Sequence, residues 1–224
     1  MTGRIAAPRL AWHPIPMQKP PVHVEMLFPT LIYRTAIAGA GRLNHDLEQA
    51  AYALAENDRA GQRWCAKHGY AGYTSYGSLA DLPARTPPFA RLKRHIERHA
   101  ARFARELHWD LRGGKPVCDT MWVNVLPEGG SHSSHIHTNA VLSGTYYVKS
   151  PLGAGPIVFE DPRHALMMAA PPRKSSAPRP LRTYVSEVPA AGTLILWESW
   201  LRHEVPLNRA AGERISVSFN LVIG

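Results

Sequence analysis

The hydrophobic period of the chain changes near residue 117, and this change most constrains its fold. Before that point, apolar residues recur every three or four positions, as in amphipathic helices. After it, short runs alternate with a period of two and are separated by Gly and Pro. Helices followed by a run of strands predict an α+β, mainly β chain with its helices packed on a sandwich or barrel. The most economical closure for these strands is a jelly roll.

Two helices are predicted in the first half of the chain. One covers about 44–60, with Asn44 as its N-cap and apolar residues at helical spacing. The other covers about 87–112, where apolar residues again recur at three or four positions, and Gly113 and Gly114 follow it. These helices are expected to pack on the sheet.

The remaining segments complete the expected organisation. The chain has 224 residues, of which 45% are hydrophobic, enough for one sizeable core, so residues 24–224 are predicted to form a single jelly-roll domain. Residues 1–23 are rich in proline and predict an extended arm, and 24–37 predict one or two edge strands. The Pro-rich, basic segment 167–180 predicts a mobile loop at one mouth of the barrel. The other predicted strands lie mainly in 117–224 and cover 118–127, 141–150, 155–161, 182–190, 192–200 and 213–224.

Charge favours anionic partners without naming one. The formal net charge is +9, which suits a carboxylate, a phosphate or an acidic protein, but equally suits a plain basic surface. No nucleic-acid-binding motif stands out, so nucleic acid is not expected as a partner. By charge alone, the basic loop 171–182 indicates an acidic small molecule or acidic peptide as substrate; its cations are Arg173, Lys174, Arg179 and Arg182. The sequence names neither the substrate nor the oligomeric state.

The sequence also gives an expectation about compartment. Cys65 and Cys118 are far apart and form no CxxC pair, as expected for reduced thiols. The N-terminal segment has no continuous apolar region of the kind found in secretory signals. No apolar run approaches the roughly 18 residues that span a bilayer. We therefore expect a soluble, cytoplasmic protein without membrane contact.

Two histidines, His135 and His137, lie one residue apart ahead of a predicted buried strand. In an extended chain residues i and i+2 point to the same face, so both imidazoles can reach one divalent ion, while Ile136 points away into packing. Such a pair alone is more often a surface coincidence or a hydrogen-bonded pair. A further histidine, His203, follows another predicted strand and strengthens the metal hypothesis.

The last predicted strand has one polar face. By alternation Arg214 and Ser216 share that face with Ser218 and Asn220. Such a face is either exposed to solvent or lines a polar cavity. In a cavity, the guanidinium of Arg214 suits a carboxylate held bidentately, and Ser216 can donate a further hydrogen bond to it.

Taken in order, these motifs resemble the Fe(II)/2-oxoglutarate-dependent oxygenases, in particular a bacterial and phage family of putative oxygenases. The segments that carry the resemblance are "LFPT", "WVN", "HIH…SGTYYV", "FEDPR", "WLRHEVPLN" and "RISVSFN". The resemblance implies a double-stranded β-helix with Fe(II) held by HxD/E and a distal His. It also implies 2-oxoglutarate chelating the metal, with its far carboxylate on an Arg or Lys of the last strand, often in RxS.

The sequence departs from that pattern at one ligand, because His137 stands where the carboxylate of HxD is expected. We favour His135, His137 and His203 as the metal ligands. Two alternatives remain: Asp161 as the carboxylate, or His132 as a ligand with His137 orienting its neighbour.

The resemblance also suggests which residues bind the cosubstrate. It assigns Arg214 and Ser216 to its far carboxylate. Asn124 is either a hydrogen-bond partner of the cosubstrate or a strand-end residue that satisfies backbone groups. Tyr146 and Tyr147 point to opposite faces, one toward the cavity and one into packing, and Tyr147 is the candidate for the cosubstrate.

Three functions are compatible with these residues. The first is an Fe(II)- and 2-oxoglutarate-dependent dioxygenase of hydroxylase type, with ascorbate as a candidate reductant. The second is a cupin-like three-His dioxygenase that does not use 2-oxoglutarate. The third is a metal-binding jelly roll without turnover. No GxSxG, HExxH or glycine-rich phosphate loop offers a rival catalytic set.

Overall fold

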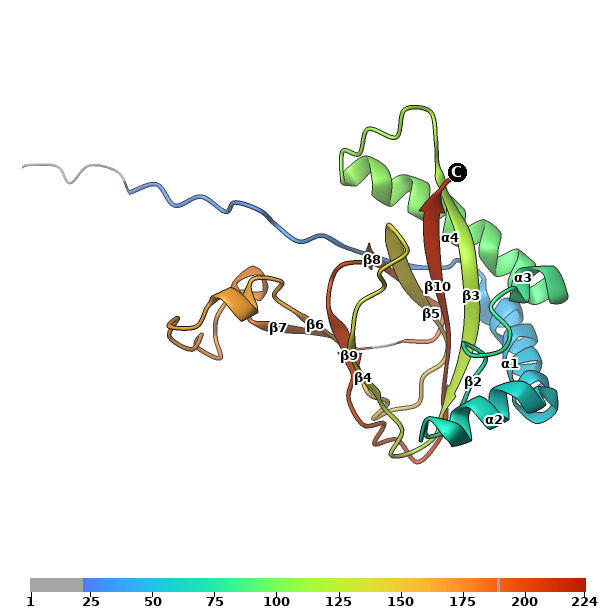
Figure 1. Cartoon of the computed structure of the whole chain (residues 1–224). Helices are drawn as coiled ribbons and strands as arrows, with labels where there is room; N and C mark the ends of the chain where they lie inside the picture. The colour runs from blue at the N-terminus through green and yellow to red at the C-terminus, as the bar shows by residue number, and fades with distance from the viewer. Residues whose placement is uncertain (1–21, 189) are drawn as a thin grey trace, which may run out of the picture.

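A computed structural model of the chain describes residues 22–188 and 190–224. It contains two antiparallel sheets, with helices against one side of the larger sheet (Figure 1). The larger sheet has six strands in the order β1 (Ile32–Ala36), β8 (Thr193–Glu198), β5 (Leu142–Lys149), β10 (Arg214–Ile223), β3 (Pro116–Leu126) and β2 (Tyr73–Thr74). The smaller sheet has four, in the order β4 (His132–His135), β9 (His203–Val205), β6 (Ile157–Glu160) and β7 (Tyr184–Glu187). This is the expected mainly β, double-stranded β-helix.

The central strands of the larger sheet are buried on both faces. One face packs on α1 (Ala40–Asn57) and α4 (Pro87–Glu106) and carries an apolar set that includes Val217 and Phe219. The other face turns toward the smaller sheet. Between the two sheets lies a second, smaller apolar cluster, which consists of Tyr147, Ile157, Phe159, Ile195, Trp197 and Leu201.

The predicted first helix differs from the observed one at both ends. Helix α1 begins at Ala40 with Gly39 as N-cap, so the prediction of Asn44 as N-cap was wrong. Asn44 lies inside the helix, where its side-chain oxygen accepts a hydrogen bond from the Tyr146 hydroxyl. The chain turns at Asp58 and continues as α2 (Arg59–Lys67), whose N-terminus Asp58 caps by accepting from the Gly61 amide at 3.0 Å.

The second predicted helix is also shorter than expected. A short helix α3 (Leu82–Arg85) precedes α4, which ends at Glu106 rather than near residue 112. His108 has a left-handed backbone (φ 53°) and stops the helix, before Gly113 and Gly114 are reached. The amides of His108 and Trp109 bond back to Arg105 and Ala104, a Schellman motif closed by a residue other than glycine.

Every strand expected between 118 and 224 is present, and β1 is the edge strand expected within 24–37. Sequence reasoning missed the short strands β2, β4 and β9. Two 3-10 turns, His164–Leu166 and Arg179–Leu181, lie in the β6–β7 connection. That connection contains the 167–180 segment and forms part of a lobe beside the barrel (Figure 1).

Most of the predicted arm, residues 1–21, lies outside the described residues. From residue 22 to β1 the chain is without regular secondary structure, and its apolar side chains at Val22, Val24 and Phe28 are exposed. In the part of the chain that the structure describes, no helix is long and apolar enough to cross a membrane.

Candidate metal centre

Three histidines from the smaller sheet and the loop after β4 meet at one point. His135 ends β4 and is the cross-strand neighbour of His203, which begins β9. His137 follows in the loop, where its amide donates to the Ser199 carbonyl at 3.1 Å. Each ring offers a nitrogen, and these three nitrogens lie within 4.8 Å of one another. Among the described residues they form a group that can hold a metal ion.

Backbone carbonyls orient two of these rings. Nδ1 of His203 lies 2.9 Å from the Leu201 carbonyl, and Nδ1 of His135 lies 2.7 Å from the Ser133 carbonyl. A carbonyl oxygen only accepts, so Nδ1 carries a proton in both rings and Nε2 is the nitrogen left to face a metal. Metal-binding histidines are oriented in this way by a hydrogen bond from the other ring nitrogen.

Burial keeps two of the three rings, those of His137 and His203, neutral. Loss of water lowers the pKa of His203 to about 3, with smaller contributions from the neighbouring His135 and His137. Loss of water and the nearby His135 lower the pKa of His137 to about 4. Both imidazoles are therefore unprotonated at neutral pH, as a metal requires of its ligands.

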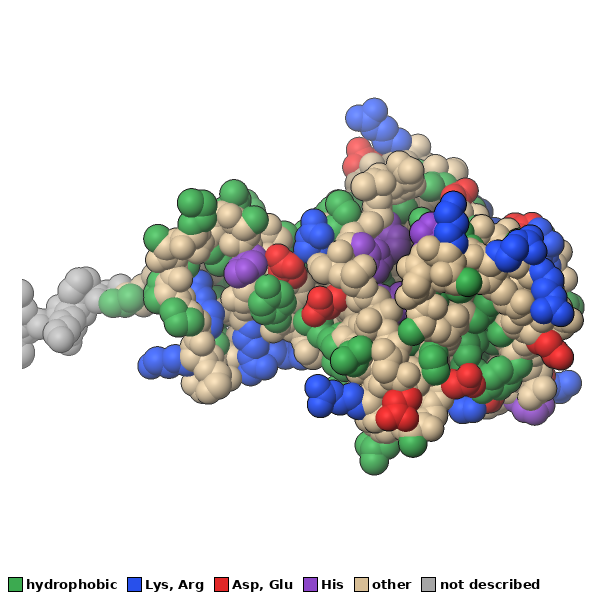
Figure 2. All heavy atoms as spheres, turned by 60° about the horizontal axis from the view of Figure 1, so that its bottom comes forward, with side chains coloured by type: hydrophobic (Ala, Val, Ile, Leu, Met, Phe, Trp, Pro, Cys, Tyr) green, Lys and Arg blue, Asp and Glu red, His purple; other side chains and the backbone are tan. Residues whose placement is uncertain are grey.

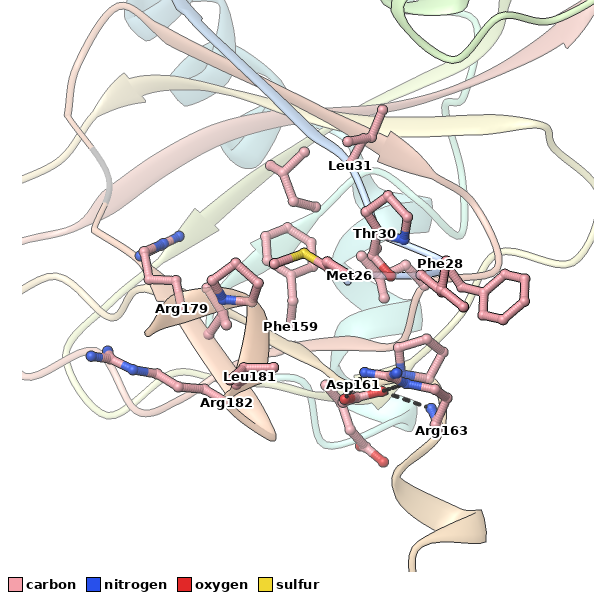
Figure 3. Close-up of a pocket in the computed structure, with 18 of the residues that line it drawn as sticks. Met26, Phe28, Thr30, Leu31, Phe159, Asp161, Arg163, Arg179, Leu181 and Arg182 are labelled. Atoms are coloured by element: carbon pink, nitrogen blue, oxygen red, sulfur yellow. Dashed lines mark hydrogen bonds and ion pairs between the residues drawn. The ribbon is translucent and has the colours of Figure 1, made fainter. Parts of the chain in front are cut away.

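The two alternative ligands lie elsewhere. His132 turns to the Tyr70 hydroxyl, 3.1 Å from its Nε2. Asp161 binds Arg163 at the edge of a separate cavity of about 550 Å³, which Arg179 and Arg182 also line (Figure 3). In the described residues neither joins the group of three nitrogens, so the geometry favours the all-histidine set. The assignment itself stays a prediction.

A buried guanidinium lies in the same barrel. Arg214, at the start of β10, is 2% exposed, and its Nη1 donates to the Ser216 hydroxyl at 3.3 Å. Its guanidinium carbon lies 5.0 Å from the ring centre of Tyr147 on β5. In the described part of the chain it pairs with no carboxylate, and both its Nε and the Tyr147 hydroxyl are buried without a hydrogen-bond partner. These atoms are suited to a carboxylate ligand.

Asn124 and Tyr147 occupy one row across the sheet. Ser216 is the cross-strand neighbour of both Tyr147 and Asn124, and Thr74 on β2 is the next in the row. The side-chain oxygen of Asn124 accepts from Thr74 at 2.8 Å, and its nitrogen donates to Ser218 at 3.1 Å. Asn124 is thus already satisfied by neighbours, which favours the structural role over the cosubstrate role.

Sequence reasoning missed several residues around the histidines. The ring centre of Trp197 lies 4.7 Å from the ring centre of His203. The ring centre of Trp122 lies 5.9 Å from that of His137. Strand alternation indicates which sheet face each tryptophan occupies but not this proximity. Tyr70, the partner of His132, lies after α2, outside any periodic segment, so the sequence carries no signal for it.

A cavity of about 670 Å³ opens beside the histidines, and its wall includes His137. Ile136, expected to point into packing, is instead 38% exposed and lines this cavity, because the chain has already left β4 at that residue. A group of histidine side chains is visible near the middle of the face drawn in Figure 2. The candidate centre is therefore reachable from outside.

The sequence comparisons agree with this geometry. Residues 120–220 match the family described as putative 2OG-Fe(II) oxygenase, and this range contains all three histidines and Arg214. No curated protein matches the chain.

The fold has relatives among solved structures. A prolyl-4-hydroxylase from Pseudomonas putida is 15% identical, with a TM-score of 0.56 over 86% of this chain and 92% of that chain. EctD from S. alaskensis, solved with bound Fe, is 15% identical, with a TM-score of 0.60 over 87% of this chain and 73% of that chain. The epimerase SnoN, solved with Fe3+, alpha ketoglutarate and nogalamycin RO, is 13% identical, with a TM-score of 0.59 over 87% of this chain and 79% of that chain. At these sequence identities the comparisons show a shared fold alone.

Proposed function

We propose that this chain, whose residues 120–220 match the family described as putative 2OG-Fe(II) oxygenase, is a non-haem Fe(II)- and 2-oxoglutarate-dependent oxygenase of hydroxylase type. One observation carries the proposal: a buried arginine without a carboxylate partner among the described residues lies in the same barrel as a cluster of three histidines. Burying a charge costs free energy unless the charge is paired. We therefore expect Arg214 to bind an anion that the described residues do not provide.

The residues present fit both groups. Imidazole nitrogens suit Fe(II), and three of them leave positions for a bidentate ligand. The unpaired Nε of Arg214 and the hydroxyls of Tyr147 and Ser216 suit the far carboxylate of a dicarboxylic acid. When bound, iron and 2-oxoglutarate supply an oxidative decarboxylation that is coupled to oxidation of a substrate carbon.

The chain itself contributes binding, orientation and exclusion of water. His135, His137 and His203 hold the metal, with two of the rings fixed by backbone carbonyls. Arg214 fixes the cosubstrate at the far wall. Phe159 and Trp197, with ring centres 6.2 and 4.7 Å from that of His203, form an apolar wall that keeps water from the centre.

Calorimetry of 2-oxoglutarate binding to the Fe(II)-loaded protein without oxygen tests the proposal. We expect binding by the native protein and none by Arg214→Ala, with Arg214→Lys weakened at least about tenfold because lysine lacks the bidentate fork. Arg163→Ala is the matched control, since it removes an exposed arginine from the other cavity. Circular dichroism checks that each variant is folded, and Tyr147→Phe gives a milder change at the same site. Equal binding by native protein and a folded Arg214→Lys would disprove the role of Arg214.

A second function has one observation in its favour. An all-histidine set is the one expected for a three-His dioxygenase that binds its organic substrate at the metal without 2-oxoglutarate. Measuring succinate released per oxygen consumed, with ascorbate present as reductant, separates the two. Stoichiometric succinate supports the first function, and oxygen uptake without succinate supports the second.

A further inference from the structure

The residues that line the cavity beside His137 favour one class of substrate. Resting on the proposed function, we propose that this cavity binds the substrate to be oxidised, and that this substrate has an aromatic or aliphatic body bearing a cationic amine. The volume, about 670 Å³, lies within the range of small-molecule sites. The inference runs against the acidic substrate that net charge alone suggests.

The cavity and the candidate metal centre share one residue, His137. His137 belongs both to the group of metal-ligating nitrogens and to the cavity wall. Its neighbour Ile136 turns outward into the same space. A molecule seated there therefore lies directly against a proposed metal ligand, which is the place for the carbon to be oxidised.

The walls are mainly apolar and include two indoles. Trp109 closes the Schellman motif at the end of α4, and Trp200, 46% exposed, follows β8. Val141 and Ile223 add aliphatic surface. Such walls bury a hydrophobic body, and indole faces also attract cations.

Among the described residues, the charged side chains in the wall of this cavity are acidic. Asp110 and Glu198 belong to the wall, while no lysine or arginine in the described part of the chain does. Oδ2 of Asp110 lies 3.9 Å from Nε of Arg112 in an exposed ion pair, so part of the charge of Asp110 is offset by this arginine. Glu198 has no ion-pair partner among the described residues and is the stronger candidate to meet an ammonium group.

The basic residues face a different space. Arg163, Arg179 and Arg182 line the separate cavity between the N-terminal segment and the β6–β7 lobe (Figure 3). Phe159 lies in the wall of that cavity and also in the buried cluster with Trp197 that packs against His203. The basic residues at that cavity are thus on the far side of an apolar layer from the histidines, which argues against their meeting the reacting substrate.

Two probes of matched size test the inference: phenethylamine, a cation, and 3-phenylpropionate, an anion. Each is titrated into the full-length, 15N-labelled protein at neutral pH, and the indole N–H signals of Trp109 and Trp200 are followed by NMR. We expect phenethylamine to shift both signals, with a dissociation constant at least about threefold lower than that of 3-phenylpropionate, the size of one solvent-accessible charge contact. Glu198→Gln should remove most of this preference, while Glu128→Gln, an exposed acid outside the cavity, should leave it unchanged.

Three results would overturn the inference: no shift with either probe, an equal or stronger effect of 3-phenylpropionate, or an unchanged preference in Glu198→Gln. None of these three results changes the outcome of the calorimetric test of 2-oxoglutarate binding. Failure of 2-oxoglutarate to bind would instead disprove the proposed function, whichever probe the cavity prefers.

Discussion

The side chain at residue 137 sets the charge of the candidate metal centre. Three neutral imidazoles leave a divalent ion with its full charge, while a carboxylate at this position would cancel part of it. The structure brings His137 to the other two rings although it lies outside the strands.

Replacing this ligand gives a direct prediction. We expect His137→Ala to weaken Fe(II) binding by more than the 10- to 100-fold that loss of a supporting residue typically costs, and His137→Asp to recover most of that loss, because a carboxylate also ligates iron. Asp161→Ala should leave the affinity unchanged, since Asp161 binds Arg163. Competition with a chelator measures all three. A large effect of Asp161→Ala would move the third ligand to that carboxylate.

His132 gives a prediction about pH. Burial, helped by the charge of Arg214, lowers the pKa of folded His132 to about 3, below the value of about 6.5 in an unfolded chain. Between these values the unfolded state binds more protons, so the stabilisation is complete above pH 6.5 and is lost as the pH falls toward 3. In the metal-free protein, His132→Gln should reduce the loss of unfolding free energy between pH 7 and 5 by about 1–2 kcal/mol. Urea titrations at each pH measure this, and a similar effect of the exposed His45→Gln would contradict it.

Part of the site could be predicted from individual residues. Spacing pairs His135 with His137, alternation puts Arg214 on a polar strand face, and the family resemblance implies that His203 is the distal ligand. The structure brings these histidines together in one barrel with that arginine. The contacts of Tyr70 and Trp109 depend on where loops return after long stretches of chain, which no local pattern records.

At the scale of elements, long periodic segments were predictable and short ones were not. Strand β5 is a run of eight residues rich in β-branched and aromatic side chains, and β10 alternates polar and apolar residues from Arg214 to Leu221, so both strands are visible in the sequence. Strands β4 and β9 have four and three residues and a shifted register between His132 and His135, so neither shows a period. These are the strands that carry His135 and His203, which is why the sequence indicated these histidines as candidate ligands but not the strands on which they lie.

The end of α4 gives a prediction at this scale. His108 takes the left-handed position of a Schellman motif, a conformation that costs free energy for any residue with a Cβ. We expect His108→Gly to raise the free energy of unfolding by about 0.5–1 kcal/mol. His68→Gly at the end of α2, where φ is −99°, should lower it instead. Urea unfolding compares the two, and a loss of stability in His108→Gly would show that its side chain makes contacts that outweigh the strain.

At the scale of the whole molecule, the larger sheet separates stability from chemistry. Its outer face joins α1 and α4 in the main apolar core. Its inner face carries Ser216 and the residues in register with it, Asn124 and Tyr147, and this face lies on the side of the histidines. One sheet therefore holds the fold together on one side and presents hydrogen-bonding groups on the other.

Adjacent residues of β10 test this division. Phe219 is fully buried on the helix side, where it packs over Gly144, while Ser218 faces inward and accepts a hydrogen bond from Asn124 at 3.1 Å. We expect Phe219→Ala to lower the free energy of unfolding by about 3–5 kcal/mol, because it removes a large apolar side chain and leaves a cavity. Ser218→Ala should cost only about 1 kcal/mol, the value of one hydrogen bond. Denaturant unfolding of the metal-free protein measures both, and equal costs would mean that the inner face contributes as much to stability as the helix-covered face.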